Sequence, residues 1–222
     1  MKKQLSLAVA VLFSAGVIFM SGCKKDDTTP PVITLTGSAV TQNLIDTYVE
    51  PGFTATDDKD GDVKSKVVVT GVVNGLVGMY TIKYDVSDAA GNAATEQTRS
   101  LTVKSDNLAG SYNVSDVITN AVPTSNNGTY AYAVTVAQSS TDYNKILINN
   151  FGGFGASVQV FATVSGSTIT IPTQSPSGMS PASSLSGTGT YTVSGGIAKI
   201  TNLTYACSDP SYGDGNATYT EQ

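Results

Sequence analysis

The stretch that decides the fold class is Tyr80-Thr81-Ile82-Lys83-Tyr84-Asp85-Val86, in which apolar and polar residues strictly alternate. Successive side chains of a β-strand point to opposite faces, so the aromatic and aliphatic residues share one face. Thr81, Lys83 and Asp85 share the other. A strand with one apolar and one polar face is typical of a sheet that packs against a core on one side only. The stretch therefore predicts a strand of a β-sandwich.

Similar short runs lie on both sides of this stretch, separated by clusters of Gly, Asn and Asp. Such runs, bounded by turn residues, indicate further strands rather than helices. Roughly seven short strands in a segment of this length fit an immunoglobulin-like sandwich. We therefore predict such a domain over residues 31–104. The expected strands are 32–36, a turn and strand within 48–55, 67–69, 80–86 and 99–103.

Four motifs of this segment resemble, in order and spacing, the bacterial surface-protein Ig-like family. The resemblance covers residues 31–104 and implies a spacer or stalk module on an extracellular protein, without an enzymatic fold. The motifs are Pro31-Val32-Ile33-Thr34-Leu35, Tyr48-x-x-Pro51-Gly52-Phe53-x-Ala55-x-Asp57, Asp60-Gly61-Asp62 and Gly78-x-Tyr80-x-Ile82-x-Tyr84-x-Val86-x-Asp88-x-Ala90-Gly91-Asn92.

The composition changes at Lys104-Ser105-Asp106-Asn107, which predicts a short linker. Residues 106–222 carry little charge but eight of the eleven tyrosines. Turn signals such as Val164-Ser165-Gly166-Ser167 connect about eight apolar runs, which predicts an antiparallel meander. We expect an all-β chain, with a closed barrel or a sandwich over residues 105–222. The expected strands are 110–114, 130–136, 145–149, 157–164, 168–171, 189–193, 197–205 and 217–220.

The second half also resembles a known kind of domain. Its motifs are similar to those of a C-terminal, lipocalin-like or sandwich-like domain on surface lipoproteins of glycan-degrading gut bacteria. The resemblance implies a location and a partner domain, but no defined activity. The motifs are Gly110-Ser111-Tyr112, Ile148-Asn149-Asn150-Phe151-Gly152-Gly153, Ile169-Thr170-Ile171-Pro172-Thr173-Gln174 and Gly187-Thr188-Gly189-Thr190-Tyr191.

The chain begins with a basic head, Met1-Lys2-Lys3, and an almost wholly apolar run from Leu5 to Met20. Together with the small residues that follow, this predicts a secretory signal peptide over residues 1–22. The run of about 16 residues is shorter than the roughly 20 that a membrane-spanning helix needs. The tetrad Met20-Ser21-Gly22-Cys23 resembles the lipobox of bacterial lipoproteins.

That resemblance implies acylation of Cys23 and cleavage before it, which makes residues 23–30 a lipidated tether. Lys24-Lys25-Asp26-Asp27 is similar to a surface-export signal, with an ordinary polar tether as the alternative. We expect an outer-membrane lipoprotein exposed at the cell surface, with the membrane as a partner through the lipid. Loss of Lys2 and Lys3 would change the formal charge from −5 to −7, which argues against nucleic acid as a partner.

The composition argues against an enzyme. The chain has no histidine, which excludes His-based triads and His acid–base chemistry. Cys207 has no second cysteine to pair with once Cys23 is lipidated, and is expected to be a small buried apolar residue. The acids of the second half adjoin turn residues or the terminus and are expected to be solvated, not a glycosidase pair. They are Asp116, Asp142, Asp209, Asp214 and Glu221.

Binding is the function that the aromatic residues favour, because their rings can stack on sugars. We predict ligand contacts from Phe151 and Phe154, in a glycine-rich loop with apolar tips, and from Tyr143 and Tyr212. The alternative for each ring is a place in the core or at a barrel rim. The expected function is a non-catalytic module that binds glycan, or outer-membrane glycan import proteins. The alternative is a structural, adhesion or assembly subunit that binds other surface proteins.

A cluster of acids suggests a calcium site, with Asp57, Asp58, Asp60 and Asp62 in one loop and Asp88 in another turn. Alternating aspartates resemble the start of an EF-hand loop. The required Gly and Glu of that motif are replaced by valines, so it is not an EF-hand. A different calcium site would need both loops at one end of the sandwich. The alternative is a solvated turn whose acids cap backbone amides.

Overall fold

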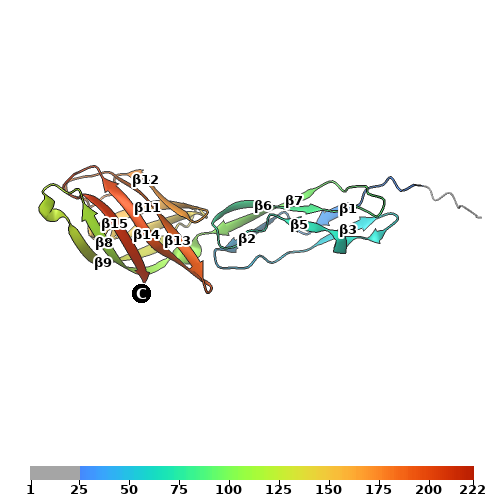
Figure 1. Cartoon of the computed structure of the whole chain (residues 1–222), viewed down its shortest axis with the longest axis horizontal. Helices are drawn as coiled ribbons and strands as arrows, with labels where there is room; N and C mark the ends of the chain where they lie inside the picture. Colours follow the sequence, from blue (N-terminus) through green and yellow to red (C-terminus); the bar gives the residue numbers. More distant parts are fainter. Residues whose placement is uncertain (1–25) are drawn as a thin grey trace, which may run out of the picture.

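The computed structural model describes residues 26–222 and has an all-β architecture, with two β units lying end to end in an elongated molecule (Figure 1). The predicted signal peptide and Cys23 lie outside the described residues. Apart from strands, the chain forms short 3-10 turns: η1 (Lys64–Lys66), η2 (Asp106–Leu108), η3 (Thr124–Asn126) and η4 (Phe151–Gly153). Among residues 26–222 there is no helix with the length and apolar character to cross a membrane.

The first unit is a two-sheet sandwich, as predicted. One sheet has the order β1-β3-β4 and the other β2-β7-β6-β5. The alternation predicted for β6 is confirmed, because Ile82 and Tyr84 are fully buried while Thr81 and Lys83 are exposed. The strands are β1 (Val32–Leu35), β2 (Ala39–Asn43), β3 (Phe53–Asp57), β4 (Gly61–Asp62), β5 (Val68–Thr70), β6 (Gly78–Asp85) and β7 (Gln97–Lys104).

A buried arginine joins the two sheets of this unit. The Arg99 side chain is fully buried, and its Nη1 lies 2.6 Å from Glu50 Oε1. The hydroxyls of Tyr48 and Tyr84 donate to Glu50 Oε2 at 2.8 and 2.6 Å. Arg99 Nη2 donates to two backbone carbonyls at 3.1 and 2.9 Å. The guanidinium charge is therefore paired and hydrogen-bonded, which a buried charge requires.

The second unit is a closed eight-stranded barrel, so the barrel rather than the sandwich is the fold. Consecutive strands pair antiparallel, and β8 pairs with both β9 and β15 to close the circle. Closure leaves no edge strand with unpaired backbone groups. The strands are β8 (Gly110–Thr119), β9 (Gly128–Gln138), β10 (Lys145–Asn149), β11 (Gln159–Ser165), β12 (Thr168–Gln174), β13 (Leu185–Ser194), β14 (Ile197–Cys207) and β15 (Asp214–Glu221).

Side chains fill the interior of the barrel. Alternate residues of each strand point inward, and most of these are aliphatic and buried. Representative residues are Val114, Val134, Ile146, Ile148, Val160, Val164, Ile169, Ile171, Ile200 and Leu203. The barrel is therefore a packed core, as is common for eight strands, and ligand contacts are expected at its ends or outer surface.

Backbone and side-chain hydrogen bonds join the two units. Val77 and Gly166 form an antiparallel bridge, with N–H to O distances of 3.1 and 2.8 Å. The hydroxyl of Tyr191 donates to the Gly166 carbonyl at 2.5 Å and accepts from the Val77 N–H at 3.0 Å. Val77 is fully buried at this contact. We call this contact, made by Val77, Gly166 and Tyr191, the joint.

The two ends of the barrel differ in their connections. The joint end carries the two-residue turns 166–167 and 195–196 and the connection 139–144. The opposite end, which we call the distal end, carries four connections without a tight two-residue turn among them and points away from the first unit (Figure 1). These connections are 120–127, 150–158, 175–184 and 208–213. Long connections can present side chains to a ligand while a rigid scaffold positions them.

Candidate functional site

Aromatic side chains gather at the distal end around a hollow of about 240 Å³. Tyr130 comes from β9, Phe154 from the connection after η4, and Tyr212 from the connection between β14 and β15. Asn126 and Ser211 add polar groups to the lining. We call Tyr130, Phe154 and Tyr212 the aromatic rim.

Edge-to-face contacts fix the orientation of the rim. The rings of Phe154 and Tyr212 lie 4.9 Å apart at 61°, and Phe154 also meets the ring of Tyr205 at 6.1 Å. Such pairs are favourable beyond the area that they bury. The side of the rim toward the core is thereby anchored. Tyr130 remains 46 % exposed.

Hydrogen bonds between the distal connections hold the rim in place. The Tyr130 hydroxyl donates to the Asn126 carbonyl at 2.8 Å, and Asn126 Nδ2 donates to the Ser211 carbonyl at 3.1 Å. The Tyr212 hydroxyl donates to the Pro181 carbonyl at 3.1 Å. Three of the four connections are thus tied together, so a ligand would meet a surface that needs little further ordering.

Two glycines allow the η4 segment to lie against the rim. Gly152 and Gly153 have φ values of 64° and 68°, a region that glycine adopts without strain. A Cβ on Gly153 would lie 2.9 Å from Cδ1 of Tyr132, which is too close. The glycine-rich stretch therefore serves close packing.

Of the predicted ligand residues, Phe151 is placed differently from the prediction. It is fully buried, and its ring lies edge-on to Tyr205 at 4.9 Å. The prediction of an exposed apolar tip is therefore wrong for Phe151, because η4 folds inward and buries this ring in the core. Phe154 and Tyr212 meet at the rim as half-buried residues. Tyr143 lies near the other end, where its carbonyl accepts the Ser105 N–H at 2.9 Å.

A buried carboxylate lies inside the barrel behind the rim. Asp116 is fully buried, and its Oδ2 accepts hydrogen bonds from Tyr132 at 2.7 Å and Tyr205 at 2.6 Å. Its Oδ1 and the hydroxyl of Tyr219 are buried without a partner. The expectation that Asp116 is a solvated loop acid is wrong. Every second residue of β8 points inward. Asp116 therefore lies on the same inward face of the strand as Tyr112, Val114 and Ile118.

The ionisation behaviour of this interior does not favour proton transfer. Burial, with the nearby Asp116 charge, raises the pKa of Tyr132, Tyr205 and Tyr219 far above the ordinary tyrosine value. These hydroxyls therefore stay protonated at neutral pH. Burial also raises the pKa of the half-buried Cys207 thiol to about 12, so little reactive thiolate forms.

The other acids of the barrel lie on its surface, as predicted. Asp142 Oδ2 lies 2.6 Å from Lys145 Nζ, and Asp209 Oδ1 accepts the hydroxyl and the backbone N–H of Ser211 at 2.7 and 2.8 Å. These hydrogen bonds lower the pKa of both carboxyls. Asp214 accepts a hydrogen bond from Asn120 at 2.8 Å.

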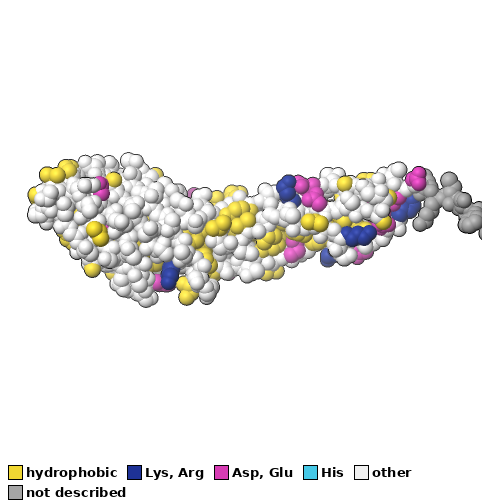
Figure 2. Space-filling view, viewed as in Figure 1, with side chains coloured by type: hydrophobic (Ala, Val, Ile, Leu, Met, Phe, Trp, Pro, Cys, Tyr) yellow, Lys and Arg dark blue, Asp and Glu magenta, His cyan; other side chains and the backbone are white. Residues whose placement is uncertain are grey.

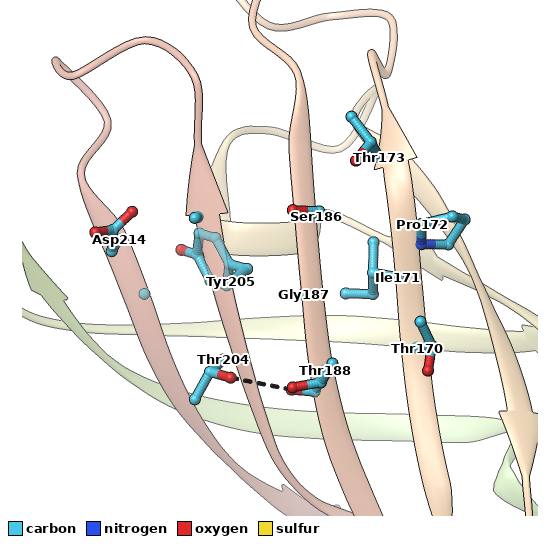
Figure 3. Close-up of a pocket in the computed structure, with 12 residues that line it drawn as sticks. Thr170, Ile171, Pro172, Thr173, Ser186, Gly187, Thr188, Thr204, Tyr205 and Asp214 are labelled. Carbon is cyan, nitrogen blue, oxygen red and sulfur yellow. Dashed lines mark hydrogen bonds between the residues drawn. The ribbon is translucent and has the colours of Figure 1, made fainter.

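A second hollow, of about 560 Å³, lies on the outer face of β12 to β15 (Figure 3). Its outward side chains are mainly hydroxyls, and Thr204 Oγ1 donates to the Thr188 carbonyl at 3.2 Å. Tyr205 lines it, but this residue is only 4 % exposed and points into the barrel. Without an exposed ring face, this larger hollow fits a flat apolar ligand face less well than the rim does.

The acids proposed for calcium separate into two groups. Asp57 and Asp88 come together with Asp27 at the end of the first unit away from the barrel. Asp60 Oδ2 accepts the Ala89 N–H at 2.7 Å, which places both acidic loops at one end of the sandwich. Asp58 and Asp62 are exposed and are not part of the group formed by Asp27, Asp57 and Asp88. Asp62 Oδ1 accepts the Lys64 N–H at 2.8 Å.

Residues 33–103 match the family model described as "Bacterial surface protein, Ig-like domain". The first unit is therefore an Ig-like domain of the kind found in bacterial surface proteins, and the resemblance seen in the sequence is confirmed there. The match covers about a third of the chain. No curated protein matches the chain.

Among solved structures, the chain is similar to a lipoprotein from Bacteroides thetaiotaomicron. The identity is 16 %, the TM-score is 0.34, and the alignment covers 86 % of this chain and 100 % of that one. It is also similar to the CBM51-2 and INT domains of ZmpB from Clostridium perfringens. The identity there is 15 % and the TM-score 0.29, with 85 % of this chain and 44 % of that one covered. TM-scores this low do not define a shared fold.

Proposed function

We propose that this protein is a non-catalytic, lipid-anchored surface protein whose barrel binds an extracellular glycan at the aromatic rim. The observation that carries the proposal is the gathering of Tyr130, Phe154 and Tyr212 around one hollow. Sugar rings present C–H groups that pack on aromatic faces, while their hydroxyls bond to nearby polar groups. Asn126 and Ser211 lie in the same lining to supply such groups.

The placement of the rim supports a presentation role. The first described residues lie at one end of the molecule and the distal connections at the other (Figure 1). If Cys23 carries the lipid, the Ig-like domain holds the rim away from the outer membrane. The hydrogen bonds of the joint connect the two units end to end, which would place the rim on the side away from the membrane.

The surface chemistry is consistent with a neutral ligand. Charged side chains gather over the Ig-like unit, whereas the visible face of the barrel is almost free of them (Figure 2). A neutral polysaccharide would not need the basic clusters that acidic polymers require. The raised tyrosine pKa values and the scattered surface acids also favour binding without catalysis.

The test is retention of the full chain in affinity gels containing neutral polysaccharides, followed by calorimetric titration with the glycan that retains it. Phe154→Ala and Tyr212→Ala should each weaken binding at least tenfold, which corresponds to about 1.4 kcal/mol. Tyr143→Ala, a matched aromatic truncation near the joint end, should bind as the parent does.

Phe151→Ala is unsuitable as evidence, because truncating a fully buried ring costs about 3–5 kcal/mol of stability by itself. Equal losses for Tyr143→Ala and Tyr212→Ala would contradict the rim as the site. Absence of retention on every polysaccharide, with capture of a defined surface protein that needs Tyr212, would favour the structural or assembly role instead.

A further inference from the structure

Three carboxylates from separate parts of the chain converge at the end of the Ig-like unit away from the barrel. Asp27 precedes β1, Asp57 ends β3, and Asp88 follows β6. One oxygen from each lies within 4.8 Å of the others. We call Asp27, Asp57 and Asp88 the acidic triad. Like charges this close repel each other unless a cation or protons compensate them.

One carboxylate oxygen of Asp57 is unsatisfied in a way that a bound cation would explain. The residue is only 9 % exposed, and its Oδ2 is buried without any hydrogen-bond partner. Its Oδ1 is fully used, because it accepts the N–H groups of Lys59 at 2.9 Å and Asp60 at 2.8 Å. A buried carboxylate oxygen without a partner is costly, whereas a bound cation would satisfy it.

No basic side chain compensates the triad within residues 26–222. The ion pairs described there involve other acids, and the nearest pair in sequence joins Lys66 to Asp60 at 3.2 Å. The Asp88 carboxylate is held by neutral donors instead, the backbone N–H and the side-chain amide of Asn92 at 2.8 and 2.7 Å.

We propose that the acidic triad binds one calcium ion, which fastens the segment before β1 to the end of the Ig-like unit. Calcium takes six to eight oxygen ligands at about 2.3–2.6 Å, so oxygens up to ~4.8 Å apart can share one ion. Carboxylates, backbone carbonyls and water would complete the shell. Magnesium requires a near-octahedral geometry with shorter distances of about 2.0–2.1 Å, so we expect it to bind here more weakly than calcium.

The neighbouring contacts are already arranged for this role. Asn92 Nδ2 donates to the Asp27 carbonyl at 3.0 Å and to Asp88 Oδ2 at 2.7 Å. This amide holds the segment against the turn, while the three carboxylate charges oppose the same approach. An ion at the triad would turn that repulsion into attraction, and calcium would order the chain between the predicted anchor and the first strand.

The test is calorimetric titration of the full chain with calcium chloride up to about 10 mM, because extracellular calcium modules bind at about 0.1–1 mM. Thermal unfolding is followed in parallel with calcium, magnesium or chelator. We expect one calcium per chain and a Tm that rises by on the order of 10 °C when calcium is a hundredfold above its Kd. Magnesium should give a smaller shift.

Asp57→Asn should weaken calcium binding at least tenfold, and Asp58→Asn is its matched control, one residue away and exposed. Asp27→Asn cannot disturb a strand, so it tests the site even if Asp57→Asn folds poorly. Calcium should also slow proteolysis before β1 in the parent chain but not in Asp27→Asn.

Absence of heat and of a Tm shift would overturn the proposal. So would calcium binding that survives Asp57→Asn. Binding that is lost in Asp57→Asn but unchanged in Asp27→Asn would place the ion within the Ig-like unit alone and overturn the fastening of the preceding segment.

Discussion

Each unit of this protein contains one carboxylate that accepts hydrogen bonds from two tyrosines, but within residues 26–222 only one of the two carboxylates is paired with a cationic side chain. The barrel carboxylate is fully buried, whereas the one in the Ig-like unit is partly exposed. In the Ig-like unit, Glu50 meets Tyr48, Tyr84 and the buried guanidinium of Arg99. In the barrel, Asp116 accepts hydrogen bonds from Tyr132 and Tyr205, and it forms no ion pair with a basic side chain of residues 26–222. Its Oδ1 has no hydrogen-bond partner there. The same pair of groups is thus compensated in one unit and not in the other.

The difference indicates different roles. The cluster around Glu50 and Arg99 joins two sheets, and we therefore expect it to act as a structural clamp. Removing one of its partners should strongly destabilise the folded state. A buried carboxylate without a cationic partner should contribute less to stability than the paired one. Three substitutions test this contrast, in decreasing order of expected effect.

Arg99→Met should have the largest effect, because it leaves Glu50 without its cation and removes hydrogen bonds to two backbone carbonyls. We expect a loss of about 3 kcal/mol in the free energy of unfolding. Chemical denaturation of the full chain, followed by tyrosine fluorescence, measures it. A loss below about 1 kcal/mol would show that the cluster is not a clamp.

Acid should weaken the clamp of the Ig-like unit. Burial raises the pKa of Glu50, but hydrogen bonds from Tyr84, Gly52 and Tyr48 and the Arg99 charge outweigh it, so the net pKa is lowered. The folded state thus prefers the charged form, and its contribution is present above the unfolded pKa. That contribution is lost as the pH falls from about 4.5 through the folded pKa.

Glu50→Gln should therefore cost on the order of 1 kcal/mol at neutral pH and nothing at low pH. Unfolding curves of both chains between pH 7 and pH 3 give the comparison. A constant difference across this range would mean that the charge of Glu50 is not what stabilises the clamp.

Asp116→Asn should have the smallest effect. It replaces a buried carboxyl group that has no cationic partner within residues 26–222, and the amide oxygen can still accept from a tyrosine. We expect the free energy of unfolding to rise or to stay within about 1 kcal/mol. A loss of 3 kcal/mol or more would mean that the carboxylate is compensated after all, and the contrast between the two units would disappear.

Local patterns predicted most of the fold. The alternation in β6 and the turn glycines of the barrel hairpins are short-range signals, and both units were predicted from them. β2 was not predicted, because Ala39-Val40-Thr41-Gln42-Asn43 is mostly polar and pairs only with β7, far along the chain. The same alternation rule would have placed Asp116 inside the barrel, had it been applied to β8.

The candidate sites depend more on long-range packing. Glycines around Phe151 suggested mobility, but the barrel core decides where that ring lies. Asp27 joins Asp57 and Asp88 from 30 and 61 residues away in the chain, by their sequence numbers. No local sequence pattern predicts that Asp27 lies beside the other two. In contrast, once the strand pairing is known, the two acidic loops are expected at the same end of the sandwich.

The parallel pairing of β2 with β7 has a mechanical consequence. If the rim is held by a bound polymer and the other end by the membrane, tension enters the Ig-like unit before β2 and leaves it after β7. In a parallel pair those two points lie at opposite ends of the strands. The pairing from Ala39–Ser100 to Asn43–Lys104 would then be loaded in shear, with all its hydrogen bonds resisting together instead of opening one by one.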